Sequence, residues 1–131
     1  MRALIIAIAL TLSACAGEPP MEPNTVMDLT GSEWGVAETE SQFIAFKSDG
    51  KLIGHGGCNR FFASYTQDED ALTIGPIGST KMLCPPDIMD GEHALFAALK
   101  NTARADISHL TLTLKDENNA AIITLQRRDW D

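Results

Sequence analysis

The sequence predicts a strand-rich α+β domain, built as an antiparallel curled sheet or a partly open β-barrel with one helix packed against it. The chain has 131 residues, and its β-compatible segments are short and separated by turn residues, as in antiparallel sheets. Leucine alternates with threonine from Leu110 to Leu114, which gives a strand one apolar and one polar face. One segment, residues 87–102, instead carries apolar side chains close to helical spacing.

Residues 1–14 are predicted to be a signal peptide that lies outside the fold. Arg2 precedes ALIIAIALTL, an apolar run of ten residues, whereas a membrane-spanning helix needs about 20. A charged start, a short apolar run and small residues are typical of secretory signals. The run is followed by Leu-Ser-Ala-Cys, which resembles the bacterial lipobox and makes Cys15 the expected lipidation site. An ordinary secreted protein cut after Ala14 is the alternative.

The lipobox resemblance implies that Cys15 becomes the acylated first residue of the mature protein. No aspartate follows it directly, which in enterobacterial lipoproteins implies the outer membrane, with the domain facing the periplasm. Residues 15–29 contain three of the six prolines, and proline-rich segments are extended and semi-rigid. We interpret them as the lipidated start and a tether. Residues 30–131 suffice for one compact domain.

The charge of the chain excludes one class of partner. The formal net charge is −8, and loss of residues 1–14 would remove Arg2 alone, leaving nine basic and eighteen acidic side chains, or −9. An acidic surface is repelled by phosphate backbones. We therefore expect no nucleic-acid partner.

The expected strands are defined by alternation and by the turns between them. Asp49-Gly50 lies between β-compatible flanks and predicts a two-residue hairpin turn. Residues 67–70 and 116–119 are rich in acidic and amide side chains and predict two further turns. The expected strands are residues 31–38, 43–47, 51–55, 61–66, 71–74, 110–114 and 121–126.

The helix is expected from Asp87 to Thr102. Prolines directly before it, an acidic residue at its start and Lys100 in its last turn all suit helix ends. Gly91 costs about 1 kcal/mol relative to alanine inside a helix. We expect the apolar face of the helix, which includes Leu95, Phe96 and Leu99, to pack across the sheet.

Several short motifs resemble the META domain family, also called HslJ-like. They are GGCNRF at 56–61, Tyr65, Leu72-Thr73-Ile74, Thr80-x-Met82-x-Cys84 and Glu92. The resemblance covers Thr30 to Arg128, with departures at Phe62-Ala63 and at Lys81. It implies a small β-rich domain with a helix, found in bacterial envelope lipoproteins linked to stress and novobiocin tolerance. No catalytic residues are established for the family.

The cysteine count suggests a disulfide. If lipid consumes Cys15, then Cys58 and Cys84 remain as an even pair in an oxidising compartment, where a bridge is the default. The bridge would enclose 84 − 58 − 1 = 25 residues and would stabilise the fold by about 3 kcal/mol in the chain-entropy model.

Three alternatives for these cysteines remain open at this point. Two unpaired buried thiols would pack as small hydrophobic groups. A tetrahedral zinc site would use Cys58 and Cys84 with His55 and His93. A nucleophilic Cys58 would need activation by His55, His93 or His109.

The residues after Cys58 are candidates for partner contacts. Asn59 and Arg60 either line a groove that binds a partner, together with Lys81, or serve the fold. In the second case Asn59 caps backbone groups and Arg60 pairs with an acidic neighbour. The sequence contains neither a G-x-S-x-G motif nor a phosphate-binding glycine loop, so we assign no catalytic residue.

We therefore expect a non-enzymatic, lipid-anchored envelope protein that binds a protein or an apolar ligand in envelope stress or drug tolerance. Its membrane contact would be the lipid anchor, and we assign it no cofactor and no metal. The alternative is a thiol- or zinc-dependent periplasmic enzyme or redox protein that uses Cys58 and Cys84.

Overall fold

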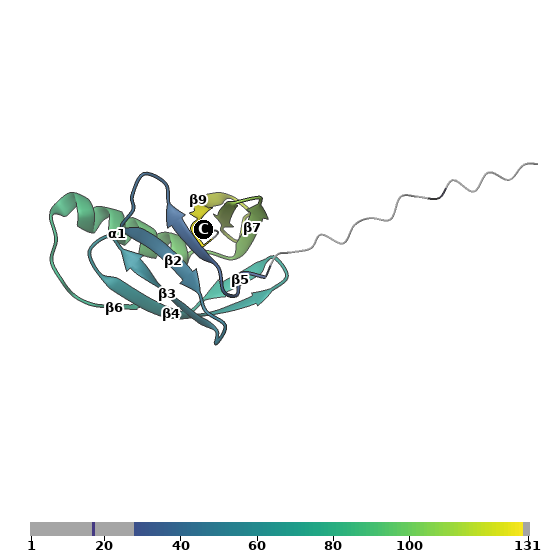
Figure 1. The fold of residues 1–131 in the computed structure, drawn as a ribbon, viewed down its shortest axis with the longest axis horizontal. Coiled ribbons are helices and arrows are strands. Elements are labelled where there is room, and N and C mark those ends of the chain that lie inside the picture. Colours follow the sequence, from purple (N-terminus) through teal and green to yellow (C-terminus); the bar gives the residue numbers. More distant parts are fainter. Residues whose placement is uncertain (1–16, 18–27, 130–131) are drawn as a thin grey trace, which may run out of the picture.

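The computed structural model describes residue 17 and residues 28–129. The predicted signal peptide, the predicted lipidation site Cys15 and almost all of the predicted tether lie outside the described residues. Nine strands and one helix form within the described part of the chain (Figure 1). They are β1 (Glu33–Val36), β2 (Gln42–Phe46), β3 (Lys51–Gly56), β4 (Arg60–Asp68), β5 (Ala71–Ile74), β6 (Gly78–Ser79), α1 (Pro86–Lys100), β7 (Arg104–Ser108), β8 (Thr111–Lys115) and β9 (Ala121–Arg127).

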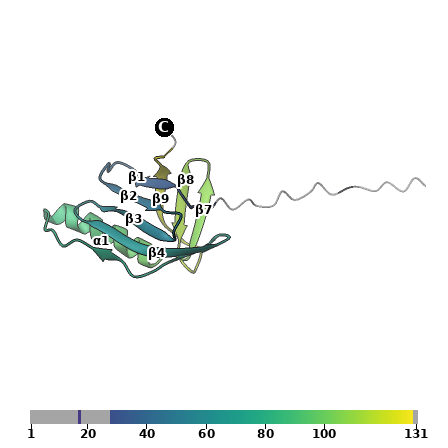
Figure 2. The ribbon, with the colours of Figure 1, turned by 60° about the horizontal axis from the view of Figure 1, so that its bottom comes forward.

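The strands form one antiparallel sheet that curls until its ends meet (Figure 2). The order is β3-β2-β1-β9-β8-β7-β5-β4-β6, and an additional pairing joins β3 to β4. Five residue pairs make that join, whereas β5 and β7 share a single pair, Ala71 with Arg104. The predicted strand-rich α+β class, with an antiparallel curled sheet and one helix, is confirmed.

The first hairpin differs from its prediction in the turn. β2 and β3 pair as expected. However, the Lys47 carbonyl accepts a hydrogen bond from the Gly50 N–H at 3.3 Å, and the Lys47 N–H donates to the Lys51 carbonyl at 2.8 Å. Three residues, 48–50, therefore form the loop. A two-residue type I′ turn needs positive φ at both central residues. Gly50 has φ of +77°, whereas Asp49 is not among the residues with positive φ.

The second and third predicted hairpins, β4–β5 and β8–β9, are confirmed. The structure adds two strands that the sequence analysis did not predict. β7 pairs with β8 through a turn in which His109 has φ of 55°. β6 pairs with residues 61 and 62 of β4.

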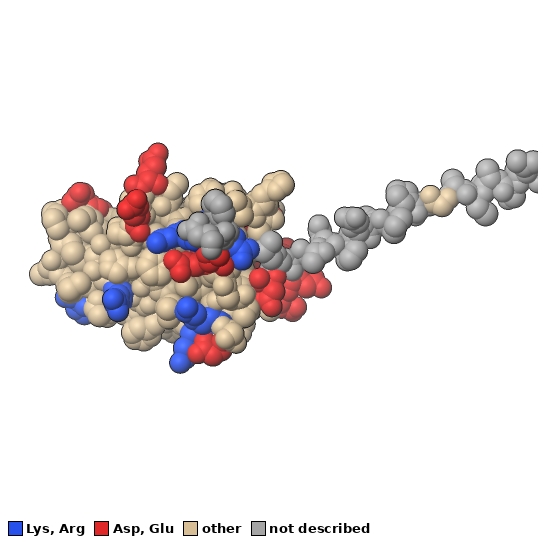
Figure 3. Space-filling view, in the orientation of Figure 1, with Lys and Arg blue, Asp and Glu red and all other residues tan. Residues whose placement is uncertain are grey.

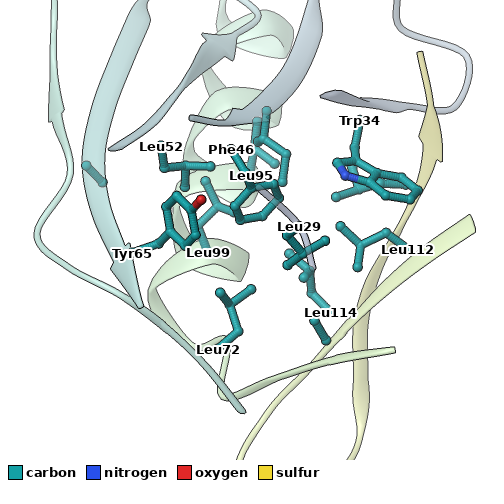
Figure 4. Packing of buried hydrophobic residues seen from close by; sticks show 14 of the residues in the cluster. Leu29, Trp34, Phe46, Leu52, Tyr65, Leu72, Leu95, Leu99, Leu112 and Leu114 are labelled. Atoms are coloured by element: carbon teal, nitrogen blue, oxygen red, sulfur yellow. The ribbon is translucent and has the colours of Figure 1, made fainter. Parts of the chain in front are cut away.

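The helix packs its apolar face into the core. Leu95 and Leu99 are buried and point towards Phe46, Leu52 and Tyr65 (Figure 4). The helix contacts β3 and begins at a proline, whose fixed φ suits the first turn. Phe96 is only half-buried at the edge of this cluster. The predicted packing of these three residues is therefore confirmed, with Phe96 at its margin.

Candidate functional site

A buried carboxylate lies where the β3–β4 turn meets the helix. Glu92 comes from the second turn of α1 and is 2% exposed. Its Oε1 accepts hydrogen bonds from the backbone N–H groups of Asn59 at 2.5 Å and Cys58 at 3.3 Å. Its Oε2 accepts another from Asn59 Nδ2 at 2.8 Å. The helix and the turn are therefore joined through one side chain, which we call the Asn59–Glu92 network.

The same asparagine also holds the loop of residues 80–84. Its Oδ1 accepts from the Met82 N–H at 2.6 Å and from Thr80 Oγ1 at 2.9 Å. Its Nδ2 donates to the Met82 carbonyl at 3.1 Å. Asn59 is thus buried and links three segments: the turn, the loop and, through Glu92, the helix.

The paired glycines before Cys58 make room for this network. A Cβ on Gly56 would lie 2.5 Å from Cγ and 2.6 Å from Oε1 of Glu92, far closer than atoms can pack. Gly57 has φ of +115°, which side chains other than hydrogen rarely allow. The Gly-Gly step therefore has a steric reason at both positions.

The surroundings of Glu92 keep it ionised. Burial raises the pKa of this carboxyl. Hydrogen bonds from Asn59 and Cys58 and the charge of His55 lower the pKa by more than burial raises it, so that it lies below the ordinary value of 4.5. A carboxylate that accepts several N–H bonds is stabilised in its charged form. Its lone pairs are directed at the protein, which suits a structural role.

A disulfide reinforces the join between the turn and the loop. Cys58 and Cys84 are bonded, with their Cα atoms 5.9 Å apart, which confirms the predicted bridge. A disulfide sulfur is neither a thiolate nucleophile nor a zinc ligand. Among the described residues, no group of three or more His, Cys, Asp or Glu side chains is placed to hold a metal ion.

The two predicted basic contact residues lie at the surface near this join. Arg60 is exposed at the start of β4, and its carbonyl accepts from the Thr80 N–H at 3.1 Å. The predicted ion pair of Arg60 does not form with any residue that the structure describes. Lys81 is exposed and its Nζ donates to Ser79 Oγ at 3.4 Å. The structure therefore brings Asn59, Arg60 and Lys81 into one region, with Asn59 beneath the surface.

A pocket that the sequence analysis missed opens beside this region. It has a volume of about 790 Å³ and lies between α1 and residues 74–83. We call it the α1 groove. Its apolar lining includes Ile74, Pro76, Ile77, Met82, Leu83, Met89, Phe96 and Ala97, and its polar lining includes Asn59, Ser79, Thr80, Lys81, Glu92, His93 and Lys100.

The sequence contains no signal for the groove, because the exposure of its apolar residues is known only from the structure. Leu83 is 92% exposed and Met82 is 58% exposed, although both are large and apolar. Methionine adapts its shape to irregular apolar surfaces and is common at binding sites.

Within the described residues, no helix is long and apolar enough to cross a membrane.

Charges are distributed unevenly over the surface. In Figure 3, acidic side chains gather at the end near β5, where the β4–β5 turn carries Asp68, Glu69 and Asp70. Basic side chains are seen near β6 and also in the middle of this face, and further acidic side chains lie at the outer end of α1.

Comparisons with known proteins agree with this architecture. The family model described as META domain matches residues 11–129. No curated protein matches the chain. An NMR structure of a protein from Burkholderia xenovorans is 22% identical, with a TM-score of 0.67, and the match covers 93% of this chain and 99% of that one.

Two further solved structures share the fold. A second NMR structure is 20% identical, with a TM-score of 0.58, over 75% of this chain and 90% of the other. The crystal structure of a DUF4847 family protein from Bacteroides vulgatus is 19% identical, with a TM-score of 0.54, over 70% of this chain and 62% of the other. At these identities the likeness concerns the fold alone.

Proposed function

Because the chain belongs to the META domain family, we propose that it is a lipid-anchored protein of the bacterial cell envelope whose domain binds an apolar ligand in the α1 groove. The anchor would be Cys15 in the outer membrane, and residues 15–29 would hold the domain in the periplasm. Binding would serve tolerance of envelope stress or of drugs, as the resemblance to META lipoproteins implies.

The observation that carries the binding proposal is the α1 groove itself. Ligand pockets are typically about 300 to 1,000 Å³, mostly apolar, with a few polar groups that orient the ligand. The groove, at about 790 Å³, falls in this range. Leu83 and Met82 lie in its wall and are exposed, and exposed apolar clusters are typical of interaction sites.

The wall of the groove is also held in place before any ligand arrives. Asn59 binds both backbone groups of Met82, and the disulfide fixes Cys84 two residues later. A preformed site loses less conformational entropy when it binds. Asn59 and the disulfide therefore support the wall of the groove.

A non-enzymatic role is the simplest use of these residues. The alternative nucleophilic or zinc-dependent enzyme needs a free thiolate or a zinc ion at Cys58 and Cys84, and the bridge between them occupies both sulfurs. Glu92 directs its carboxylate at Asn59 and Cys58. We therefore propose a binding module.

Photolabelling tests the binding proposal in the protein's own membrane. Envelopes that contain the full chain are exposed to a long-chain alcohol carrying a diazirine, and labelled peptides are mapped by mass spectrometry. We expect label in α1 and in residues 74–83. Leu83→Asp should reduce it strongly, whereas Leu110→Asp, on an exposed leucine at the β7–β8 turn, should not. Absence of label from both segments, or equal label in the two variants, would contradict the proposal.

A further inference from the structure

We infer that the ligand of the α1 groove is a long-chain fatty acid, whose chain lies along α1 and whose carboxylate pairs with the lysines at the rim. This inference rests on the proposed binding at the groove and adds the chemical class of the ligand. It is carried by the shape of the groove, by its charge and by the lack of acidic partners for its lysines.

The shape of the groove suits one extended chain. Met89, His93, Phe96, Ala97 and Lys100 all line it, and their spacing of three and four residues puts them on one helix face. At 1.5 Å per residue, the stretch from residue 89 to residue 100 measures about 16 Å. A single acyl chain is a long, narrow apolar body that matches such a stripe.

The charge of the groove is opposite to that of the domain. The chain has 18 acidic and 10 basic side chains, yet the described residues that line the groove include Lys81, Lys100 and His93 and one carboxylate, Glu92. That carboxylate already accepts three hydrogen bonds from Cys58 and Asn59. An anion in the groove would therefore meet cations that are not neutralised locally.

Lys81 and Lys100, like Lys47 and Arg60, form no ion pair with any residue that the structure describes, whereas the other five cations of the described domain do. Lys51, Arg104, Lys115, Arg127 and Arg128 each lie within 4.0 Å of a carboxylate. Among the residues that the structure describes, neither Lys81 nor Lys100 has such a neighbour. In a strongly acidic domain, unpaired cations beside an apolar groove provide charge complementarity for an anionic amphiphile.

Hydroxyl groups next to Lys81 extend the same polar site. Ser79 Oγ is 3.4 Å from Lys81 Nζ, and Thr80 also lines the groove. A carboxylate can accept hydrogen bonds from an ammonium group and from a hydroxyl at once. Ile74, Ile77 and Phe96 offer the apolar surface that the remainder of the ligand needs.

The test compares two photoprobes that differ in their headgroup alone. The diazirine alcohol described above is matched with the fatty acid of the same length, and label in α1 and residues 74–83 is quantified for each. The variants are Lys81→Gln with Lys100→Gln, and, as a control with the same change of net charge, Lys51→Gln with Lys115→Gln. Melting temperatures confirm that both double variants are folded.

We expect the acid to label the groove more strongly than the alcohol. The acid-to-alcohol ratio should fall about two- to fivefold when Lys81 and Lys100 are replaced, since a partly exposed ion pair contributes up to about a fivefold factor. The control should leave the ratio unchanged. If the ratio is near one, or is equal in both double variants, the fatty-acid inference is overturned while the binding proposal stands. If neither probe labels these segments, both fail.

Discussion

At the scale of single residues, Asn59 and Glu92 explain why the motif around Cys58 has its composition. Two glycines let the turn approach Glu92, and the Asn59 amide satisfies two backbone groups of Met82. The sequence predicted a capping role as one option for Asn59. It did not predict Glu92 as its partner, because the two are 33 positions apart in the chain and a local sequence pattern does not indicate a contact over that distance.

Removal of the Asn59 side chain should destabilise the domain strongly. Asn59→Ala removes a partner from the buried Glu92 carboxylate and from the partly buried backbone groups of Met82, and a buried polar group that loses its partner costs about 1 to 3 kcal/mol. We expect a loss of at least about 2 kcal/mol in the free energy of unfolding, measured by denaturant titration. Asn118→Ala, on an exposed turn residue, should change it by less than about 0.5 kcal/mol. Equal effects would contradict the network.

The charge of Glu92 should make stability depend on pH. Its pKa is lower in the folded state than the ordinary value of 4.5, so its contribution is fully present above that value and is lost as the pH falls through the folded pKa. The stability difference between the wild type and Glu92→Gln should therefore be largest at neutral pH and shrink below about pH 4.5. A difference that stays constant from pH 7 to pH 3 would show that Glu92 is not held ionised.

At the scale of elements, the helix, β1 and the three hairpins follow from local patterns, whereas β6 and β7 do not. The apolar spacing and the terminal residues placed α1 within two residues of its observed ends, Pro86 and Lys100. β6 has two residues, Gly78 and Ser79, which carry no strand signal. β7 reads Arg-Ala-Asp-Ile-Ser, and its short alternation directly follows the helix, so it resembles a connection.

Two adjacent helix residues should differ in their contribution to stability. Leu95 is 2% exposed in the core, whereas Phe96 is half-buried against Phe61, with ring centroids 5.2 Å apart. Leu95→Ala should cost about 2 to 5 kcal/mol. Phe96→Ala should cost less than its full core value of about 3 to 5 kcal/mol. Denaturant unfolding of both variants measures the two losses in free energy of unfolding. A larger loss for Phe96→Ala than for Leu95→Ala would contradict the placement of Phe96 at the margin of the core.

The bridge between the turn and the loop should also show in stability. Reduction should lower the melting temperature by about 10 °C, because the 25 enclosed residues correspond to about 3 kcal/mol. Cys58→Ala, Cys84→Ala and the double variant should be destabilised alike, since each removes the same cross-link. Mass spectrometry of the unreduced, alkylated protein provides the control: alkylation of both cysteines would contradict the bridge.

At the scale of the whole molecule, the closure of the sheet is the feature that local sequence could not reveal. β1 pairs with β9, and β5 meets β7 through one residue pair, so the ring depends on contacts between distant segments. The α1 groove arises in the same way, between α1 and the segment of residues 74–83. Local patterns were sufficient to predict the class of the fold. The groove could not be predicted from them, because it depends on tertiary contacts.

The anchor proposed at Cys15 should be separable from the domain. Cys15→Ser should prevent acylation and release the protein from a lipid-held association with the membrane, with the melting temperature of the domain unchanged. Fractionation after a high-salt wash measures this, and Ser13→Ala, which leaves the cysteine in place, is the control. Retention of Cys15→Ser in the washed membrane would contradict a lipid anchor.

The central claim, that the α1 groove is the binding site, is tested most directly by isotope-edited NMR. The full chain is placed in bicelles of deuterated lipid, and contacts are measured between a ¹³C-labelled fatty acid and the protein. We predict contacts with Met89, Phe96 and Ile77 of the groove. Contacts confined to Phe62 and Ile53, which are paired neighbours exposed on the outer face of the sheet, would contradict the account.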